Sequence, residues 1–139
     1  MNKYISAGIV VYRLKEKKRE YLILQYARGH WGFAKGKVEK NETLLQAAHR
    51  ELLEEANISA KITIGFQHSF DYFFTDYDDK KAHKEVTFFV GRACVDSDKI
   101  VLSDEHSSYS WKSYKEVLEA LTYQNAKDLL QKVERFLNK

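Results

Sequence analysis

The sequence predicts an α+β fold, in which a mixed β-sheet is packed between helices as a three-layer α/β sandwich. Runs rich in Ile, Val, Leu and Tyr at residues 4–12 and 21–26 precede a stretch with helical periodicity at 43–56. Further strand-like runs follow, and two more helical patterns come after them. This order of strands and helices is typical of a sheet that is covered by helices.

Composition and charge exclude several classes of protein. The chain has 139 residues, of which 44% are hydrophobic and 31% charged, and its net charge is +3. These values predict one folded domain over residues 1–139, without wholesale disorder or the strongly basic surface of a nucleic-acid-binding protein. The single cysteine, Cys94, excludes an intramolecular disulfide and a cysteine-rich zinc site. No apolar run has the length of a membrane span and no convincing secretory leader is present, so we expect a cytoplasmic protein that contacts no membrane.

Strands are predicted where β-branched and aromatic residues lie between polar segments. The charged segment 15–20 separates the first two strands, as in a hairpin, and the charged segment 75–84 is predicted to be a loop. The predicted strands are 4–12, 21–26, one or two within 61–74, a mostly buried one at 85–95 and a short one at 109–112.

Three helices are predicted from their first turns and their apolar stripes. Thr43 and Gln46 form a capping-box pattern, so the first helix should begin near residue 44. Ser113 and Glu116 form the same pattern before the second helix. The last helix has an apolar stripe made by Leu129, Leu130, Val133, Phe136 and Leu137.

The first helix has a cluster of acidic residues near its end. At about 100° per residue, Glu54 and Glu55 lie about 60° to one side and about 40° to the other side of Glu51. Their repulsion and the negative end of the helix dipole both disfavour the helix, and a divalent cation such as Mg²⁺ or Mn²⁺ would offset both effects. Arg50 flanks these carboxylates and could orient one of them. The predicted core face, on the opposite side, consists of Leu45, Ala48, Leu52, Leu53 and Ala56.

The residues around this cluster resemble the Nudix box, which has the pattern G-x5-E-x7-R-E-U-x-E-E-x-G-U with U aliphatic. The matching positions are Gly36, Glu42, Arg50, Glu51, Leu52, Glu54, Glu55 and Ile58. Asn57 stands where the family has Gly. That glycine would end the helix in a left-handed conformation, which Asn also tolerates, so the substitution leaves the motif intact.

The resemblance to Nudix proteins implies a hydrolase that cuts a pyrophosphate bond of a nucleotide, with Mg²⁺ or Mn²⁺ as cofactor. It implies metal binding by Glu51, Glu54 and Glu55, with the carbonyl group of Gly36 as a further ligand. Divalent ions would neutralise the phosphates and lower the pKa of the attacking water. Glu54 and Arg50 would then belong to the catalytic set.

Segments outside the box resemble asymmetric diadenosine tetraphosphate hydrolases. They are Ser6-Ala7-Gly8, His30-Trp31-Gly32 and the stretch from Leu102 to Trp111, which contains Glu105-His106. The resemblance implies that Glu105 is a metal ligand or base and that Lys35, Lys84 and His30 bind the substrate near its phosphates. It also implies that Tyr72 and Tyr123 stack on an adenine ring. We therefore expect cleavage of diadenosine tetraphosphate to ATP and AMP by attack of water on a phosphate.

Other functions stay open at this point. A related pyrophosphohydrolase could act on a nucleoside triphosphate or on the 5′ end of an RNA, and a nucleotide-sensing module could keep the fold without turnover. The intact set of Glu51, Glu54 and Glu55 argues against the sensing module. A P-loop is excluded because Gly36-Lys37 is followed by Val38 and the spacing is one residue short. Cys94 lies in an apolar run, which argues against a thiol nucleophile.

Overall fold

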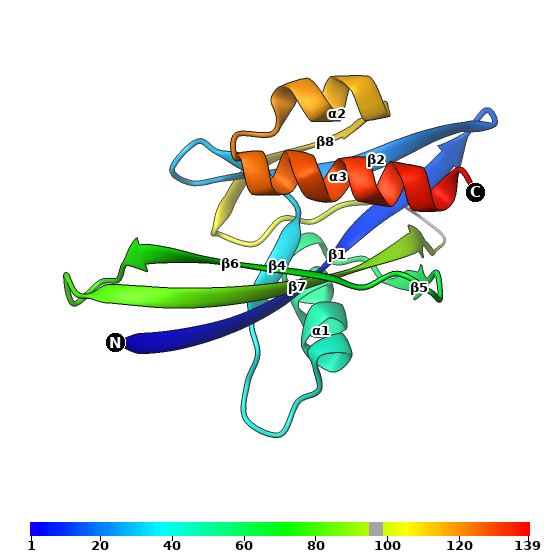
Figure 1. Ribbon diagram of the computed structural model, residues 1–139. Helices are drawn as coiled ribbons and strands as arrows, with labels where there is room; N and C mark the ends of the chain where they lie inside the picture. Colours follow the sequence, from blue (N-terminus) through cyan, green and yellow to red (C-terminus); the bar gives the residue numbers. More distant parts are fainter. Residues whose placement is uncertain (95–98) are drawn as a thin grey trace.

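The computed structural model describes residues 1–94 and 99–139, and it confirms the α+β prediction (Figure 1). The strands are β1 (Asn2–Lys15), β2 (Lys18–Tyr26), β3 (Trp31–Gly32), β4 (Ala34–Lys37), β5 (Ala60–Ile62), β6 (His68–Thr75), β7 (Lys81–Ala93) and β8 (His106–Lys112). The helices are α1 (Leu44–Ala56), α2 (Tyr114–Ala120) and α3 (Gln124–Leu137). The strand predicted at 85–95 coincides with β7 as far as Ala93. The prediction is wrong for Cys94, which is exposed beyond the end of β7, and Val95 lies outside the described residues. In the described ranges no helix is long and apolar enough to cross a bilayer.

The sheet is organised around β1. One edge of β1 pairs in parallel with β7 along residues 2–12. Its other edge pairs with β4 at residues 6–9 and then with β2 at residues 12–15, both antiparallel. The outer strands β3 and β8 pair with β2, and β5 and β6 pair with β7. A mixed sheet is the result, with β4 held beside the first half of β1.

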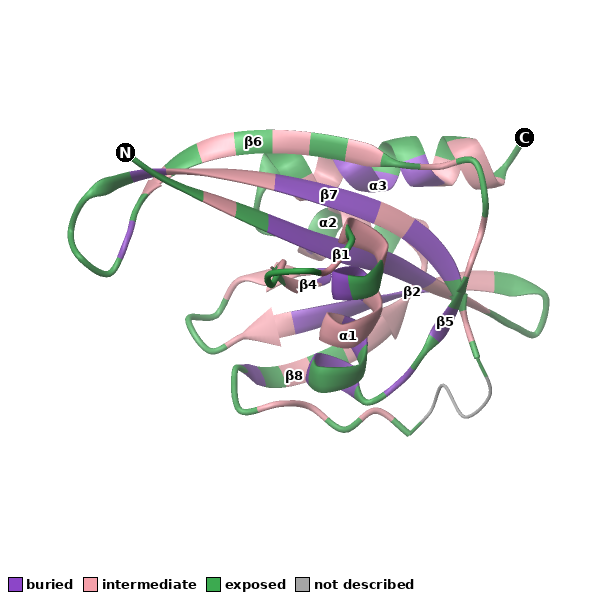
Figure 2. Cartoon of the chain, turned by 90° about the horizontal axis from the view of Figure 1, so that it is seen from below, coloured by how far each residue is buried: buried purple, intermediate pink, exposed green. Residues whose placement is uncertain are grey.

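The two faces of the sheet carry separate apolar clusters. Alternate residues of a strand point to opposite faces, so Ile9 packs with the α1 cluster and Val10 with the α2–α3 cluster. From α1, Leu52 joins the first cluster, whereas Leu130 of α3 joins the second. Figure 2 shows the buried stretches of β1 and β7 between these helical layers. The predicted three-layer arrangement, a sheet between helices, is thereby confirmed.

The connections between strands are tighter than the sequence predicts. The β1–β2 hairpin turns on Glu16 and Lys17 alone, which have φ values of 53° and 68°. The predicted connection at 15–20 is therefore too long, because pairing continues to Lys15 and Lys18. Likewise, the predicted loop at 75–84 is wrong beyond residue 80, since β7 begins at Lys81.

Asp76 explains why the second of these turns is so short. Its Oδ1 accepts hydrogen bonds from the backbone N–H groups of Asp78 and Lys80, at 3.0 and 3.1 Å. Such a side chain takes the place of a backbone partner within the turn. The chain reverses within five residues, and β6 and β7 form a long hairpin that extends beyond the body of the molecule (Figure 1).

Candidate active site

Helix α1 presents the acidic cluster, and both of its ends are fixed as the sequence predicts. The Thr43 side chain accepts from the N–H of Gln46, and the Gln46 side chain accepts from the N–H of Thr43. At the other end Asn57 is left-handed, with φ 57° and ψ 32°, and its N–H donates to the carbonyl of Leu53. The capping box and the left-handed Asn are both confirmed.

The predicted core face of α1 is wrong in one important respect. Leu53 is 56% exposed, whereas Glu55 is only 3% exposed. The buried residues run from Ala47 at about −40° to Ala56 at about +140° relative to Glu51, so the middle of this arc is at Glu55. The acidic edge is therefore part of the buried face and does not lie opposite to it.

Glu55 is the most buried member of the acidic cluster. Its Oε1 accepts a hydrogen bond of 3.0 Å from the backbone N–H of Lys35. Burial, reinforced by the nearby charges of Glu51 and Glu105, raises the pKa of Glu55 to about 9. At neutral pH this carboxyl group holds a proton unless a cation stands beside it.

Glu51 lies against the glycine of the motif. A Cβ atom built on Gly36 would overlap the carboxylate of Glu51, so any larger residue there would displace this side chain. Burial raises the pKa of Glu51, and the charges of Glu54 and Glu105 add to this, while Arg50 acts in the opposite direction. The close approach brings the backbone of β4 and the carboxylate of α1 to one place.

Arg50 holds the exposed side of the cluster together. Its Nε and Nη2 donate to both carboxylate oxygens of Glu42, at 2.7 and 3.0 Å, and Nη2 also donates to the carbonyl of Lys37. Its Nη1 donates to Glu51 at 2.9 Å and to Glu54 at 3.1 Å. The guanidinium thus orients two members of the acidic cluster, in agreement with the sequence analysis.

Glu105 reaches the cluster on a segment that is fastened to the end of α1. The last carbonyls of that helix, those of Glu55 and Ala56, accept hydrogen bonds from the N–H groups of Ser103 and Val101. Helix carbonyls at this position have no partner within the helix. Glu105 is exposed, and its charge raises the pKa of Glu55. The segment before β8 is thereby placed beside the buried carboxyl group.

Lys35 and Lys84 come from different strands but lie close together. Burial lowers the pKa of Lys35 to about 8, and the charge of Lys84 lowers it further, against an opposing effect of Glu55. Burial also lowers the pKa of Lys84. Among the described residues neither amine forms an ion pair with a carboxylate. Two neighbouring lysines without an acidic partner are suited to an anionic ligand.

Tyr72 and Tyr123 are also near one another, as expected. Burial raises the pKa of Tyr72, and the nearby Tyr123 adds to the effect. Tyr123 precedes α3 and is 58% exposed. Its ring is 5.3 Å from that of His30 and tilted by 54°. Burial and the charges of Lys35 and Arg28 lower the pKa of His30, which disfavours its charged form.

Tyr26 is a residue of the site that the sequence analysis missed. Its ring stacks on His30 at 4.4 Å and is tilted against His106 at the same distance. Its hydroxyl group donates to the carbonyl of Phe33 at 2.8 Å. Burial raises the pKa of Tyr26, and the charges of Glu55 and Glu105 add to this. Tyr26 therefore separates the aromatic part of the site from the acidic part.

His106 supplies a buried nitrogen atom without a partner. Its Nε2 makes no hydrogen bond and lies 4.0 Å from Oε2 of Glu55, a distance too long for a hydrogen bond. Its Nδ1 is 3.1 Å from the hydroxyl of Ser103. Burial lowers the pKa of His106, which disfavours the charged ring beside Glu55.

The chemistry of the acidic cluster fits a divalent cation. In the described ranges no three acidic, imidazole or thiol side chains are arranged to hold a metal ion together. Two of the carboxylates are held by Arg50 and a third by the N–H of Lys35. Nevertheless these side chains gather hard oxygen donors at one place, and the charge of Glu51 raises the pKa of Glu55. Carboxylate oxygens are the ligands that Mg²⁺ and Mn²⁺ prefer, and a cation bound there would relieve this repulsion.

The NUDIX domain pattern matches residues 3–133 of the chain. The chain belongs to the NUDIX family. Two curated relatives are asymmetrical bis(5′-nucleosyl)-tetraphosphatases. The one from Caenorhabditis elegans is 33% identical over 134 residues, which is 95% of each chain. The one from Sus scrofa is 30% identical over 143 residues, which is 95% of this chain and 94% of the relative.

A solved structure supports the same relationship. The binary complex of an Ap4A hydrolase from C. elegans has a TM-score of 0.80 and 29% identity, and the match covers 97% of this chain and 98% of the other. This chain is therefore a Nudix hydrolase with the fold expected from its sequence. In Nudix terms, α1 and the preceding strand β4 form the box, from Gly36 to Ile58.

Proposed function

We propose that this Nudix hydrolase cleaves dinucleoside polyphosphates, with diadenosine tetraphosphate giving ATP and AMP. One observation supports the proposal above the others. Glu55 of α1 accepts from the backbone of Lys35, and the side chain of Lys35 lies near that of Lys84; neither lysine forms an ion pair with a carboxylate in the described residues. The carboxylates of this site are suited to bind divalent cations, and the lysine amines are suited to bind the phosphates of a polyphosphate.

The acidic cluster would hold the cofactor, Mg²⁺ or Mn²⁺. Its ligands would be Gly36 through its carbonyl group, Glu51, Glu54, Glu55 and Glu105. When bound, the ion would neutralise phosphate charge and lower the pKa of water, and the repulsion that raises the pKa of Glu55 would be relieved.

The protein's own groups would then position the substrate. Lys35 and Lys84 would hold phosphate oxygens, with His30 at the edge of the same site. Tyr72 and Tyr123 are close but their rings make no mutual stacking contact in the described structure, which leaves them free to bind a base between them. Base stacking of this kind contributes about 1–3 kcal/mol.

Proton transfer from the attacking water needs a carboxylate that is ionised and accessible. Glu54 has a side chain that is 57% exposed, and Glu105 is exposed with a carboxylate that accepts no hydrogen bond from the described residues. We assign the base to this pair. Arg50 would act as a positioning residue, because it donates to Glu51 and to Glu54.

Analysis of products tests the proposal. The purified protein would be incubated with Mg²⁺ and, separately, diadenosine tetraphosphate, ATP and a triphosphorylated RNA. We expect ATP and AMP in equal amounts from the first substrate and little product from the others. Release of pyrophosphate from ATP or from the RNA 5′ end would instead support a triphosphate pyrophosphohydrolase, and no turnover of any nucleotide would support a sensing module.

Two variants complete this test. Glu54→Gln and Glu55→Gln should each abolish hydrolysis while circular dichroism shows an unchanged fold. Unchanged turnover in both variants would contradict the roles given to these residues. The cytoplasmic location and the single domain over residues 1–139 stay predictions from the sequence.

A further inference from the structure

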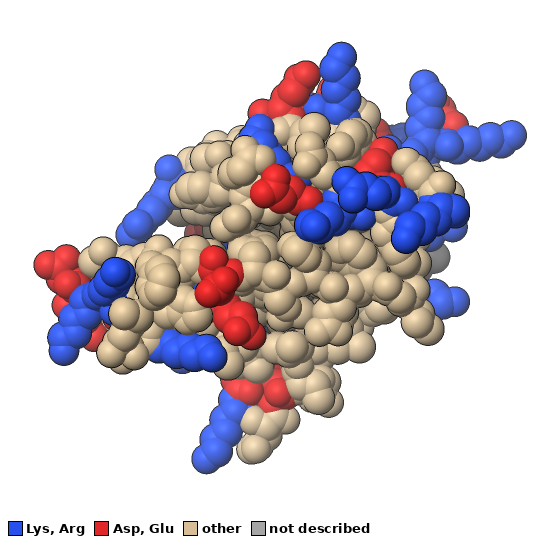
Figure 3. Space-filling model, in the orientation of Figure 1, with Lys and Arg blue, Asp and Glu red and all other residues tan. Residues whose placement is uncertain are grey.

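A second hollow lies beside the turn of the β6–β7 hairpin. It has a volume of about 350 Å³, within the range that small-molecule pockets occupy. It is lined by residues of β1, of the loop after β2 and of the hairpin, and Figure 3 shows the surface hollowed between the hairpin and the upper part of the molecule. None of the roles proposed above uses this space except for that of Lys84, which is part of its wall.

The wall of this hollow is aromatic and cationic. Phe74 and Tyr4 are in contact, with ring centroids 5.5 Å apart. Tyr77 also lines the hollow and is 90% exposed, so its ring is accessible to a ligand. Arg28 and Lys84 supply two positive charges, and Nζ of Lys84 lies 5.4 Å from the ring centroid of Phe74.

The hollow adjoins the proposed base site. Tyr72 and Phe74 are two residues apart on β6, so they share one face of the sheet, and their rings are 6.2 Å apart. Across the strands, Lys84 is paired with Tyr72 on one side and with Tyr4 on the other. Lys84 thus stands between the two aromatic spaces and belongs to both.

We propose that this hollow binds the second nucleoside of the substrate, with Tyr77 against the base and Arg28 on the phosphate next to it. The inference rests on the proposed function, since only a substrate with a nucleoside at each end needs two base sites. Lys84 lies between the two aromatic spaces, so its amine could contact the polyphosphate chain that joins the two nucleosides. The hollow accordingly favours dinucleoside over mononucleoside polyphosphates.

The hydrogen bonds of Asp76 predict how well this second site discriminates between bases. All four acceptor positions of its carboxylate are used, by the side chains of Asn2 and Tyr4 at Oδ2 and by the N–H groups of Asp78 and Lys80 at Oδ1. Asp76 therefore has no acceptor left for the amino group of a base. Recognition rests on stacking, and adenine and guanine should bind about equally well at this end.

The inference can be tested by equilibrium binding in EDTA, where no turnover occurs. Calorimetry would compare diadenosine tetraphosphate with adenosine 5′-tetraphosphate, which has the same phosphates and one nucleoside. We expect the wild type to bind the first ligand about tenfold more tightly. Tyr77→Ala should remove most of this preference without weakening adenosine tetraphosphate by more than about twofold. Arg28→Gln removes a contact to a phosphate that both ligands carry, so it should weaken both ligands and keep the preference. Both side chains are exposed, so neither variant should disturb folding.

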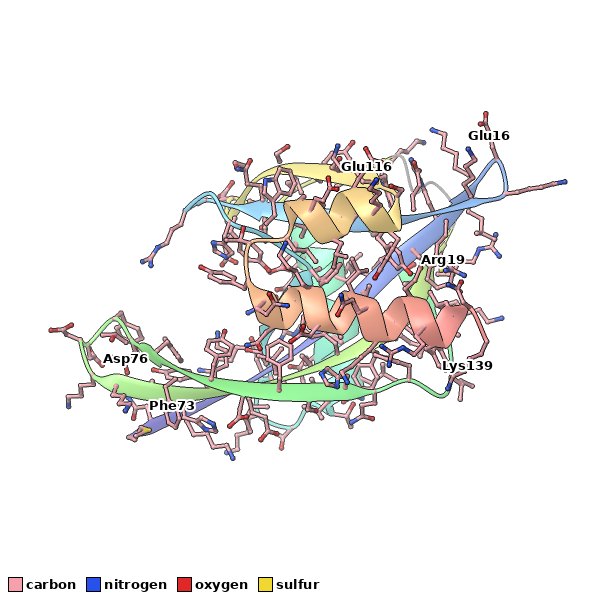
Figure 4. All side chains as sticks on the ribbon, turned by 45° about the horizontal axis from the view of Figure 1, so that its top comes forward. Glu16, Arg19, Phe73, Asp76, Glu116 and Lys139 are labelled. Atoms are coloured by element: carbon pink, nitrogen blue, oxygen red, sulfur yellow. The ribbon has the colours of Figure 1, made fainter. Side chains whose placement is uncertain are left out.

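Phe73→Ala is the matched control. Phe73 is 58% exposed on the same hairpin but belongs to the opposite face of β6, and Figure 4 shows it pointing away from the body of the molecule. This variant should keep the wild-type preference. Equal binding of the two ligands by the wild type, or an equal loss for both ligands in Tyr77→Ala, would overturn the inference. Because binding is measured without turnover, this outcome is independent of whether the product assay supports the proposed reaction.

Discussion

At the scale of single residues, Glu55 combines a stability cost with a proposed function. Its side chain is buried, and burial raises its pKa to about 9 from an ordinary value of 4.5. A raised pKa means that the folded state binds a proton that the unfolded state has lost. The contribution of the neutral acid to stability is present below about pH 4.5 and is lost progressively as the pH rises towards about 9.

The first prediction concerns the cation-free protein. Between pH 5 and pH 7 in EDTA, the free energy of unfolding of the wild type should fall by up to about 3 kcal/mol. Glu55→Gln should lose less, because an amide stays neutral and its oxygen can still accept from the N–H of Lys35. Urea unfolding at several pH values provides the measurement, with the exposed Glu54→Gln as control. A fall in Glu55→Gln as steep as in the wild type would refute this explanation.

The second prediction concerns Tyr72, which we assign to the base and not to the reacting phosphate. Tyr72→Ala should raise KM for diadenosine tetraphosphate by about tenfold while kcat changes by less than about twofold. A stacking contact that is equally strong in the ground state and the transition state contributes to KM but not to kcat, so its removal raises KM alone. Tyr72→Phe keeps the ring and should behave like the wild type. Steady-state kinetics decide the point, and a loss confined to kcat would contradict the assignment.

At the scale of elements, the sequence predicts best those features that depend on neighbouring residues. Thr43 and Asn57 were correctly expected at the two ends of α1, because capping is local chemistry within three or four positions. The buried face of α1 was predicted wrongly because Leu53 is exposed and Glu55 is buried, the reverse of what the hydrophobicity of the two side chains predicts. The sheet packs on the side of the helix that holds the glutamate, against the ordinary preference for burying leucine.

Contacts between distant elements were the hardest to predict from residues alone. Lys35 and Lys84 are 49 positions apart, and only the pairing of both β4 and β7 with β1 brings them together. The resemblance to Nudix proteins supplied both lysines, whereas Tyr26 has no place in the box and was missed. The strands β3 and β4 were also missed, because they are short and contain Gly32 and Gly36, which weaken any strand pattern.

The third prediction concerns the end of α1. The φ value of 57° at Asn57 is unfavourable for a β-branched residue and favourable for glycine. Asn57→Val should destabilise the protein by about 1–2 kcal/mol, and Asn57→Gly should leave it unchanged or up to about 1 kcal/mol more stable. Urea unfolding measures both.

Asn138 gives the matched control for this prediction. It ends α3 with a φ of −89°, which any residue adopts, so Asn138→Val should have little effect. Equal effects of valine at the two positions would show that the left-handed conformation at Asn57 does not matter for stability.

At the scale of the whole molecule, the C-terminal helix connects the far side of the sheet with the proposed base site. Tyr123 lies directly before α3, so its position depends on how this helix is held. The other end of α3 is anchored through Glu134, which accepts from the Tyr21 hydroxyl at 2.6 Å and from Arg19 at 2.8 Å. Figure 4 shows Arg19 beside this end of the helix. Tyr21 is fully buried, so its hydroxyl group depends on this one acceptor.

The last prediction follows from that anchor. Glu134→Ala leaves the buried Tyr21 hydroxyl without its acceptor, which should lower the free energy of unfolding by about 1–3 kcal/mol. Tyr21→Phe removes the hydroxyl group itself, and in that background Glu134→Ala should have a smaller effect, as a double-mutant cycle would show. Because Tyr123 is attached to the same helix, Glu134→Ala should also raise KM for diadenosine tetraphosphate more than it lowers kcat. Stability loss with unchanged KM would mean that Tyr123 is positioned by its local contacts with His30 and not by the anchoring of α3.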